Sequence, residues 1–185
     1  MSADSTASDA APNIRPLLDT PLNIAVVTVS DTRTEETDVS GDVLVQRLQQ
    51  AGHTLQAKSI IKDDVYQLRA EVSAHIADPE IHAVLMTGGT GFTLRDNTVT
   101  AIKPLLDVAI EGFGELFRQL SYEEIGSSTI QSRAFAGLAN GTIVFCLPGS
   151  PGACKTGWDK IIAEQLNNEH KPCNFADKLL ITPVD

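Results

Sequence analysis

The sequence predicts an α/β protein, a three-layer sandwich with a mostly parallel central sheet, and three observations lead to that fold class. Runs of apolar and β-branched residues alternate along the chain with segments of helical periodicity, the pattern of strand–helix–strand units. The runs are apolar at successive positions, as in strands that are covered on both faces. The length of 185 residues suffices for one domain with a sizeable core and is short for two large ones.

Four runs are expected to form strands of this sheet. The first is the continuous apolar run Asn23-Ile24-Ala25-Val26-Val27-Thr28-Val29, where the ordered chain should begin. Comparable runs occupy residues 54–62, 81–87 and 142–147. Because helical segments separate the runs, we expect most neighbouring strands to be parallel.

Helices are expected between and after these strands, each with one apolar stripe. Gly52 lies where a residue just beyond a helix end belongs, and Pro79 ends the second helix. Pro104 should kink or stop the third helix at about Lys103. The five stripes are Leu44, Leu48 and Ala51; Val65, Leu68, Val72 and Ile76; Val99, Ile102 and Leu106; Phe113, Leu116, Phe117 and Leu120; and Trp158, Ile161, Ile162 and Leu166.

The chain divides into a tail and one domain. Residues 1–20 are rich in Ser, Ala, Asp and Pro without periodicity, which predicts a disordered N-terminal tail before an α/β domain at 21–185. The tail has neither a basic start nor an apolar stretch, so no signal peptide is expected. Three cysteines without a CxxC pair favour free thiols in a reducing compartment, and hence a cytoplasmic location.

Composition argues against two classes of partner. The net charge is −10 and only 5% of the residues are aromatic, whereas proteins that bind nucleic acid use basic surfaces and stacking platforms. No run of about 18 apolar residues is present, so no membrane-spanning segment is expected.

The carboxyl ends of the strands are where a parallel sheet is expected to bind its ligand. Four segments follow the predicted strands at this edge: residues 30–32, 63–64, 87–91 and 148–152. Thr87-Gly88-Gly89-Thr90-Gly91 is the strongest candidate, because three glycines in four residues allow main-chain N–H groups to approach an anion closely. A tight turn between strand and helix is the alternative. The segment is not a GxGxxG dinucleotide fingerprint.

Carboxylates lie near this glycine loop in the sequence. Asp63 and Asp64 follow the second strand, and Asp96 lies five residues beyond the loop. Each could simply cap the helix that follows it. The functional alternative is that they hold a divalent cation, because two carboxylates beside an anion loop would otherwise repel phosphate. Magnesium is therefore the predicted metal, and the residues alone leave open which of these carboxylates hold it.

Other chemistry-bearing residues were weighed against structural roles. Residues 149–156 partly match a phosphate-binding P-loop, but Cys154 replaces the required glycine and Pro151 removes one N–H group, so a nucleotidase of that kind is disfavoured. Cys146 lies within an apolar strand and is expected to be an inert core thiol. Arg118 and Arg133 could reach an anion, although arginines on a helix face are usually solvated.

An ordered set of motifs resembles the MoaB/MogA family of molybdenum cofactor biosynthesis proteins, and is closer to the MoaB branch. The resemblance covers nearly everything from Leu22 to about Ile181. Any one motif is weak, whereas the set in this order is highly specific. The motifs are residues 28–31, 87–91 with Asp96, 111–115, 124–129, 132–134 with Gly137, 147–151 and the tail 172–175.

The resemblance implies a function: transfer of AMP from ATP to the terminal phosphate of molybdopterin, giving adenylyl-molybdopterin and pyrophosphate. Asp63 and Asp96 would be the catalytic carboxylates and would also hold Mg²⁺ as cofactor. The residues implied in binding molybdopterin and ATP are Ser30, Asp31, Asp64, Gly88, Gly89, Thr90, Gly91, Ser121, Pro148, Gly149 and Ser150.

The resemblance further implies a homo-oligomer, a trimer or a hexamer, with other proteins of the same pathway as further candidate partners. It also leaves an alternative open. Members of the MoaB branch include proteins that keep the pocket without the transferase activity, and Cys146 stands at a strand end where active relatives often have asparagine. The alternative function is a non-catalytic molybdopterin-binding or scaffold protein.

Overall fold

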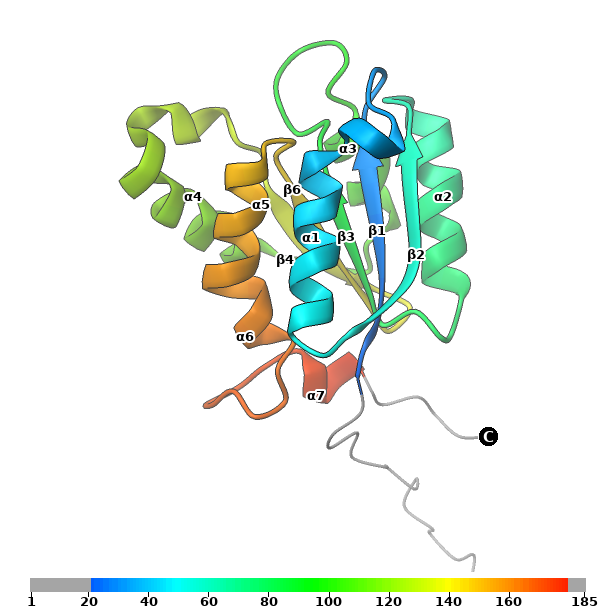
Figure 1. The fold of residues 1–185 in the computed structure, drawn as a ribbon, viewed down its shortest axis with the longest axis vertical. Coiled ribbons are helices and arrows are strands. Elements are labelled where there is room, and N and C mark those ends of the chain that lie inside the picture. The colour runs from blue at the N-terminus through cyan, green and yellow to red at the C-terminus, as the bar shows by residue number, and fades with distance from the viewer. Residues whose placement is uncertain (1–20, 180–185) are drawn as a thin grey trace, which may run out of the picture.

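The computed structural model describes residues 21–179, which form one six-stranded sheet with helices on both faces (Figure 1). The strands are β1 (Asn23–Val29), β2 (Thr54–Ile61), β3 (Ala83–Thr87), β4 (Val108–Ile110), β5 (Phe135–Ala139) and β6 (Thr142–Leu147), in the order β2-β1-β3-β6-β5-β4. The first four strands in that order are parallel, whereas β5 pairs antiparallel with β6 and β4 pairs antiparallel with β5. The predicted three-layer α/β class is confirmed. The predicted tail 1–20 lies outside the described residues.

Two apolar layers lie on opposite faces of the sheet because successive strand residues point to opposite sides. On one face, residues of α1 (Val39–Gln50), α4 (Glu111–Ile125) and α5 (Pro151–Gly157) pack around Phe145. On the other, α2 (Val65–Ala77) and α3 (Thr98–Ile102) pack on Val27, Val84 and Val144. The strands are therefore covered on both faces, as their unbroken apolar runs predicted.

The remaining helical segments are short. They are the 3₁₀ turns η1 (Glu35–Thr37), η2 (Lys103–Leu105) and η3 (Gly126–Gln131), the π-helical segment η4 (Trp158–Ile162) that continues α5, α6 (Ala163–Gln165) and α7 (Ala176–Leu179). Among residues 21–179, no helix combines the length and apolar character needed to cross a membrane.

Most predicted boundaries are confirmed. Gly52 follows α1 with φ +87°, and α3 stops at Ile102 before the 3₁₀ turn that contains Pro104. Two strands were missed by the sequence analysis. β4 has three residues, too few to show a period of two, and β5 contains Gly137, whose missing side chain leaves room for Leu106 and the Val108 carbonyl.

Candidate functional site

The loops that follow β1, β2, β3 and β6 meet at one edge of the sheet, at the top of Figure 1. Ser30 donates its N–H to the carbonyl of Ile61 at 2.9 Å, and Gly88 donates to the carbonyl of Leu147 at 3.0 Å. A Cβ on Gly149 would lie 3.2 Å from the Cα of Gly88. The loop at 88–97 is thus in direct contact with the 148–150 loop, as the strand-end rule predicted.

The first two glycines of the loop are required by its backbone. Gly88 has φ +103° and Gly89 has φ +65°, values that favour glycine. A Cβ on Gly88 would collide with the carbonyl oxygen of Val29, and one on Gly89 with the Thr98 hydroxyl. The loop is therefore a tight turn, which is the alternative that the sequence left open. It packs closely against Val29 and Thr98, and its main-chain groups also lie at the surface of a cavity.

The carbonyl groups of this loop are held on one side. Thr98 donates its hydroxyl to the carbonyl of Gly88 at 2.8 Å and its N–H to that of Gly89 at 3.0 Å. In a trans peptide the C=O and the following N–H point in opposite directions. The N–H groups of Gly89 and Thr90 therefore point away from Thr98, and no acceptor within residues 21–179 contacts them. The N–H of Gly88 donates to the carbonyl of Leu147, and that of Gly91 donates to Asp96. The predicted phosphate contact of the whole 88–91 loop is therefore restricted to the amides of Gly89 and Thr90.

A cavity of about 530 Å³ opens beside this loop, between α4, η3 and the start of α5. Its volume lies within the range of small-molecule sites. Nine of the predicted site residues line it: Gly88, Gly89, Thr90, Gly91, Asp96, Ser121, Pro148, Gly149 and Ser150. The structure thus brings together residues from four separate segments of the chain.

Ser30 and Asp31 do not line this cavity, although both lie at the same edge. The Ser30 hydroxyl accepts the N–H groups of Thr32 and Arg33, which closes the turn after β1. The Asp31 carboxylate accepts the Nε of Arg95 at 2.9 Å. This ion pair joins the loop after β1 to the loop after β3. Contact of Ser30 or Asp31 with a ligand stays a prediction.

Asp64 corrects a sequence interpretation, because it caps a helix and does not line the cavity. Its carboxylate accepts the N–H groups of Tyr66 and Gln67 at 3.0 and 2.9 Å, at the start of α2. The sequence left both roles open, and a carboxylate one position after the strand end satisfies the helix amides that would otherwise lack partners.

Asp64→Ala is therefore expected to lower the free energy of unfolding by about 1 kcal/mol, the usual cost of losing an N-cap. Ligand binding should not change at temperatures where the variant is folded. Urea denaturation followed by circular dichroism gives the first quantity, and calorimetric titration gives the second. A loss of ligand affinity with unchanged stability would contradict the assignment.

Asp96 lies at the cavity, and its carboxylate organises the loop around it. It accepts the N–H of Thr93 at 2.7 Å. Burial opposes ionisation, but hydrogen bonds from Thr93 and from the Gly91 backbone, with the charge of Arg133, outweigh it and lower the pKa of Asp96. Asp96 is consequently a fixed anion at neutral pH. A Cβ on Gly91 would lie 2.8 Å from one of its oxygens.

Asp63 lies on the other side of the glycine loop and is only 5% exposed. Its carboxylate accepts the N–H of Asn97 at 2.9 Å, and a Cβ on Gly89 would lie 3.2 Å from its Oδ2. Burial raises the pKa of Asp63, the negative charges of Asp96 and Asp31 raise it further, and the hydrogen bonds from Asn97 oppose the shift. Asp63 and Asp96 thus flank one loop, as predicted, but only Asp96 lines the cavity.

The raised pKa of Asp63 predicts a pH-dependent stability difference. A carboxyl group whose pKa is higher in the folded state contributes stability below its ordinary value of 3.8, and loses it as the pH rises through the folded pKa. Asp63→Asn removes that loss while its amide oxygen still accepts the Asn97 N–H. The variant should melt at a higher temperature than the parent at pH 7, and the difference should disappear below pH 3.8. Equal melting temperatures across this range would contradict the shift.

The carboxylates suit magnesium, the predicted metal. Magnesium is bound in proteins through one or two carboxylates together with substrate phosphates and water. Asp63 and Asp96 supply two carboxylates at a loop whose Gly89 and Thr90 amides contact no acceptor within residues 21–179. Burial is the main cause of the raised pKa of Asp63, and a cation would relieve the smaller contribution from the charge of Asp96. Among the described residues, no cluster of three Asp, Glu, His or Cys side chains has the arrangement of a metal site. Magnesium binding by Asp63 and Asp96 stays a prediction.

Several residues that line the cavity were not singled out by sequence reasoning. Glu124 is the most constrained of them, because it accepts the Thr156 hydroxyl at 2.8 Å and the Lys160 ammonium at 3.0 Å. The hydrogen bond from Lys160, with that from Thr156, lowers the pKa of Glu124. Ser128 and Gln131 also line the cavity. In the sequence, only the family motif at 124–129 indicated that this segment is functional, and the motif assigned no role to any single residue.

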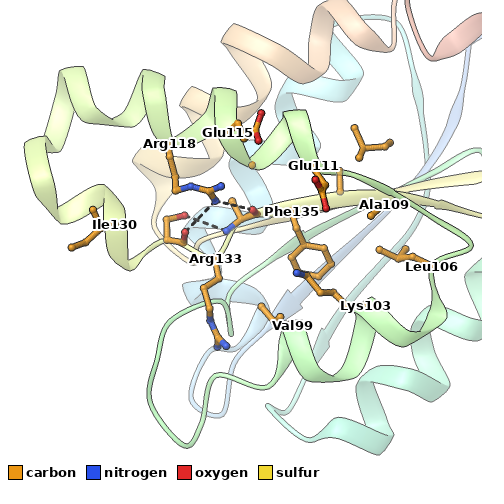
Figure 2. A pocket seen from close by; sticks show the side chains of 15 residues that line it. Val99, Lys103, Leu106, Ala109, Glu111, Glu115, Arg118, Ile130, Arg133 and Phe135 are labelled. Atoms are coloured by element: carbon orange, nitrogen blue, oxygen red, sulfur yellow. Dashed lines mark hydrogen bonds between the residues drawn. The ribbon is translucent and has the colours of Figure 1, made fainter.

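The two arginines that were considered as anion contacts take different places beside a second cavity of about 570 Å³ (Figure 2). Arg118 approaches the carbonyls of Ser132 and Ala134, at 3.5 and 3.4 Å. Arg133 points away from Arg118 toward the loop that precedes α3, where it contacts carbonyls and not an anion. Neither residue lines the cavity at the glycine loop.

Cys146 is confirmed as a core thiol. It is fully buried, its Sγ lies 3.7 Å from the Sδ of Met86, and burial raises its pKa strongly. It belongs to the apolar layer under α2 and α3 and does not line the cavity.

Comparisons with known proteins agree with the motifs. The family model described as "Probable molybdopterin binding domain" matches residues 25–168. Molybdenum cofactor biosynthesis protein B of Escherichia coli (strain K12) is 53% identical over 155 residues, 84% of this chain and 91% of that protein. The Bacillus subtilis (strain 168) protein of the same name is 49% identical over 142 residues, 76% of this chain and 84% of that protein.

Solved structures give the same relationship. A crystal structure of Molybdenum cofactor biosynthesis protein B superposes with a TM-score of 0.77 at 45% identity, over 80% of this chain and 92% of the other. The tungsten cofactor synthesizing protein MoaB from Pyrococcus furiosus gives 0.70 at 38% identity, over 78% and 92%. The chain belongs to the MoaB family of molybdenum cofactor biosynthesis proteins.

Proposed function

We propose that the chain is a molybdopterin adenylyltransferase, which uses ATP and Mg²⁺ to adenylate the terminal phosphate of molybdopterin. The observation that carries the proposal is that the amides of Gly89 and Thr90 contact no acceptor among residues 21–179 and lie at a cavity that Asp96 also lines. Main-chain N–H groups are suited to bind phosphate oxygens. Membership of the family and the cavity volume support the same substrate class.

The proposed reaction is an in-line displacement at phosphorus. An oxygen of the molybdopterin phosphate attacks the α-phosphorus of ATP, a new P–O bond forms, and the bond to the β-phosphate breaks, so that pyrophosphate leaves with the bonding electron pair. No general base is needed, because a phosphate monoester is largely ionised at neutral pH. The bound magnesium would offset the charge of the phosphates.

The protein's own residues would then align the reactants. The amides of Gly89 and Thr90 hold phosphate oxygens, and Asp96 fixes the loop through Thr93 while presenting a charged oxygen to the cavity. The buried carboxylate of Asp63, which lies close to Gly89, adds a second negative charge. Alignment and charge stabilisation are the main contributions available to an enzyme in this reaction.

The test is pyrophosphate release by the purified protein with molybdopterin and MgATP. Release that requires both substrates, with adenylyl-molybdopterin identified by mass spectrometry, is the expected result. Absence of release, at concentrations where the protein binds molybdopterin, would reject the transferase.

One observation favours the second candidate, a non-catalytic molybdopterin-binding or scaffold protein. Asp63 is almost fully buried and outside the cavity lining, so only one of the two proposed catalytic carboxylates is open to the ligand. A binder of this kind would take up molybdopterin with the same affinity with and without MgATP. Turnover would exclude it.

A further inference from the structure

Arg133 holds the glycine loop through main-chain carbonyls. Its Nε donates to the carbonyl of Thr90 at 3.1 Å, and its Nη2 donates to the carbonyls of Gly91 and, at 3.0 Å, Asp96. The guanidinium also lies 4.8 Å from the centre of the Phe92 ring. One half-buried side chain therefore contacts four residues of the same loop.

These contacts complete the set begun by Thr98. Thr98 holds the carbonyls of Gly88 and Gly89, and Arg133 holds those of Thr90 and Gly91. Four consecutive carbonyls are thus held by two side chains. Because each trans peptide directs its N–H opposite to its C=O, Thr98 fixes the amides of Gly89 and Thr90, and Arg133 fixes the peptides that follow them directly.

We infer that Arg133 is a positioning residue, which anchors the loop directly after the amides of Gly89 and Thr90, through the carbonyls of Thr90, Gly91 and Asp96, and so keeps these two amides in place for phosphate. The inference rests on the proposed function, since it names the support of the same phosphate site. Arg133 itself touches no ligand, because it lines the second cavity and not the one at the loop (Figure 2). It acts through the backbone.

Arginine is the side chain that suits this task. Its planar guanidinium presents donors in fixed directions, so it can hold carbonyls of several peptides at once, whereas the ammonium of lysine is a single compact charge. A neighbouring residue supplies the anchor: Ala134 is buried, and β5 begins at Phe135. The loop is therefore tied to the edge of the sheet through Arg133.

The experiment compares Arg133→Ala and Arg133→Lys with the parent and with Arg118→Ala, the matched control. Arg118 approaches two carbonyls at 3.4 and 3.5 Å but none in the glycine loop. Calorimetric titration with inorganic pyrophosphate and with ATP measures anion binding without turnover. We expect both Arg133 variants to bind about tenfold or more weakly, in line with the cost of lost preorganised donors, and Arg118→Ala to bind as the parent does.

Rescue separates positioning from general destabilisation. Methylguanidinium at millimolar concentration should restore part of the pyrophosphate affinity of Arg133→Ala and leave that of the parent unchanged. Arg133→Lys keeps the positive charge, so parental affinity in that variant would show that charge alone matters and overturn the inference. Parental affinity in Arg133→Ala would overturn it as well.

The two proposals fail in distinguishable ways. If the parent releases no pyrophosphate from ATP but Arg133→Ala still loses pyrophosphate binding with rescue, the transferase is rejected and the positioning role stands for an anion site. If the parent turns over and Arg133→Ala matches it in both KM and kcat, the positioning role is rejected and the transferase stands.

Discussion

Asp96→Asn is expected to lower the rate of adenylyl transfer about a hundredfold, the scale of loss when one preorganised charge or donor is removed from such a site. The amide has nearly the shape of the carboxylate, and its oxygen can still accept the Thr93 N–H at 2.7 Å. What is lost is the negative charge at the cavity. The loop should therefore remain folded while its interaction with a phosphate-bound cation weakens.

The measurement is single-turnover formation of adenylyl-molybdopterin at saturating MgATP. Asp64→Ala serves as the matched control, because Asp64 is a carboxylate at the same edge of the sheet whose oxygens are used by α2. The control should transfer AMP at the parental rate below its melting temperature. A parental rate in Asp96→Asn would remove Asp96 from the reaction.

Gly88→Ala is expected to disrupt both the site and the stability of the fold. A side chain at φ +103° is strained, and its Cβ would collide with the carbonyl oxygen of Val29, which is part of β1 and cannot move away. Together these terms should lower the free energy of unfolding by about 2–4 kcal/mol. Pyrophosphate binding should be lost as the loop shifts.

Urea denaturation and calorimetric titration measure the two effects. Gly112→Ala is the control: Gly112 lies in α4 with no atom within 4 Å of an added Cβ, so alanine should be neutral or slightly stabilising there. If Gly88→Ala were as stable as Gly112→Ala and bound pyrophosphate normally, the loop could not have the backbone described above.

The parts of the fold that the sequence predicted best are those with a local physical signal. β1 and β6 have the predicted limits because their unbroken apolar runs stop at Ser30 and at Pro148. α3 ends before Pro104 because proline cannot continue the helical hydrogen bonds. β4 and β5 carry no such signal. β4 becomes a strand only because β5 offers it hydrogen-bond partners, a tertiary effect.

The same distinction between local signals and tertiary effects applies to the candidate site. The glycine loop and Asp96 could be predicted because glycine content and the strand-end rule are both readable from neighbouring residues. The role of Asp64 was ambiguous, since a cap and a ligand look alike in sequence. The contact of Arg133 with Thr90 spans 43 residues, and that of Arg95 with Asp31 spans 64. Such pairings depend on how distant elements pack.

The strand order places β4 at one edge of the sheet and β2 at the other, and these two edge strands differ in length. β4 ends the antiparallel side after only three residues, so it exposes too few main-chain groups to recruit another chain into a growing fibril. β2 ends the parallel side and is eight residues long, but Lys58 lies in its middle and pairs with Asp42 at 2.8 Å. An incoming apolar strand would meet that charge. We therefore expect the shortness of β4 to limit aggregation at one edge of the sheet, and the charge of Lys58 to limit it at the other.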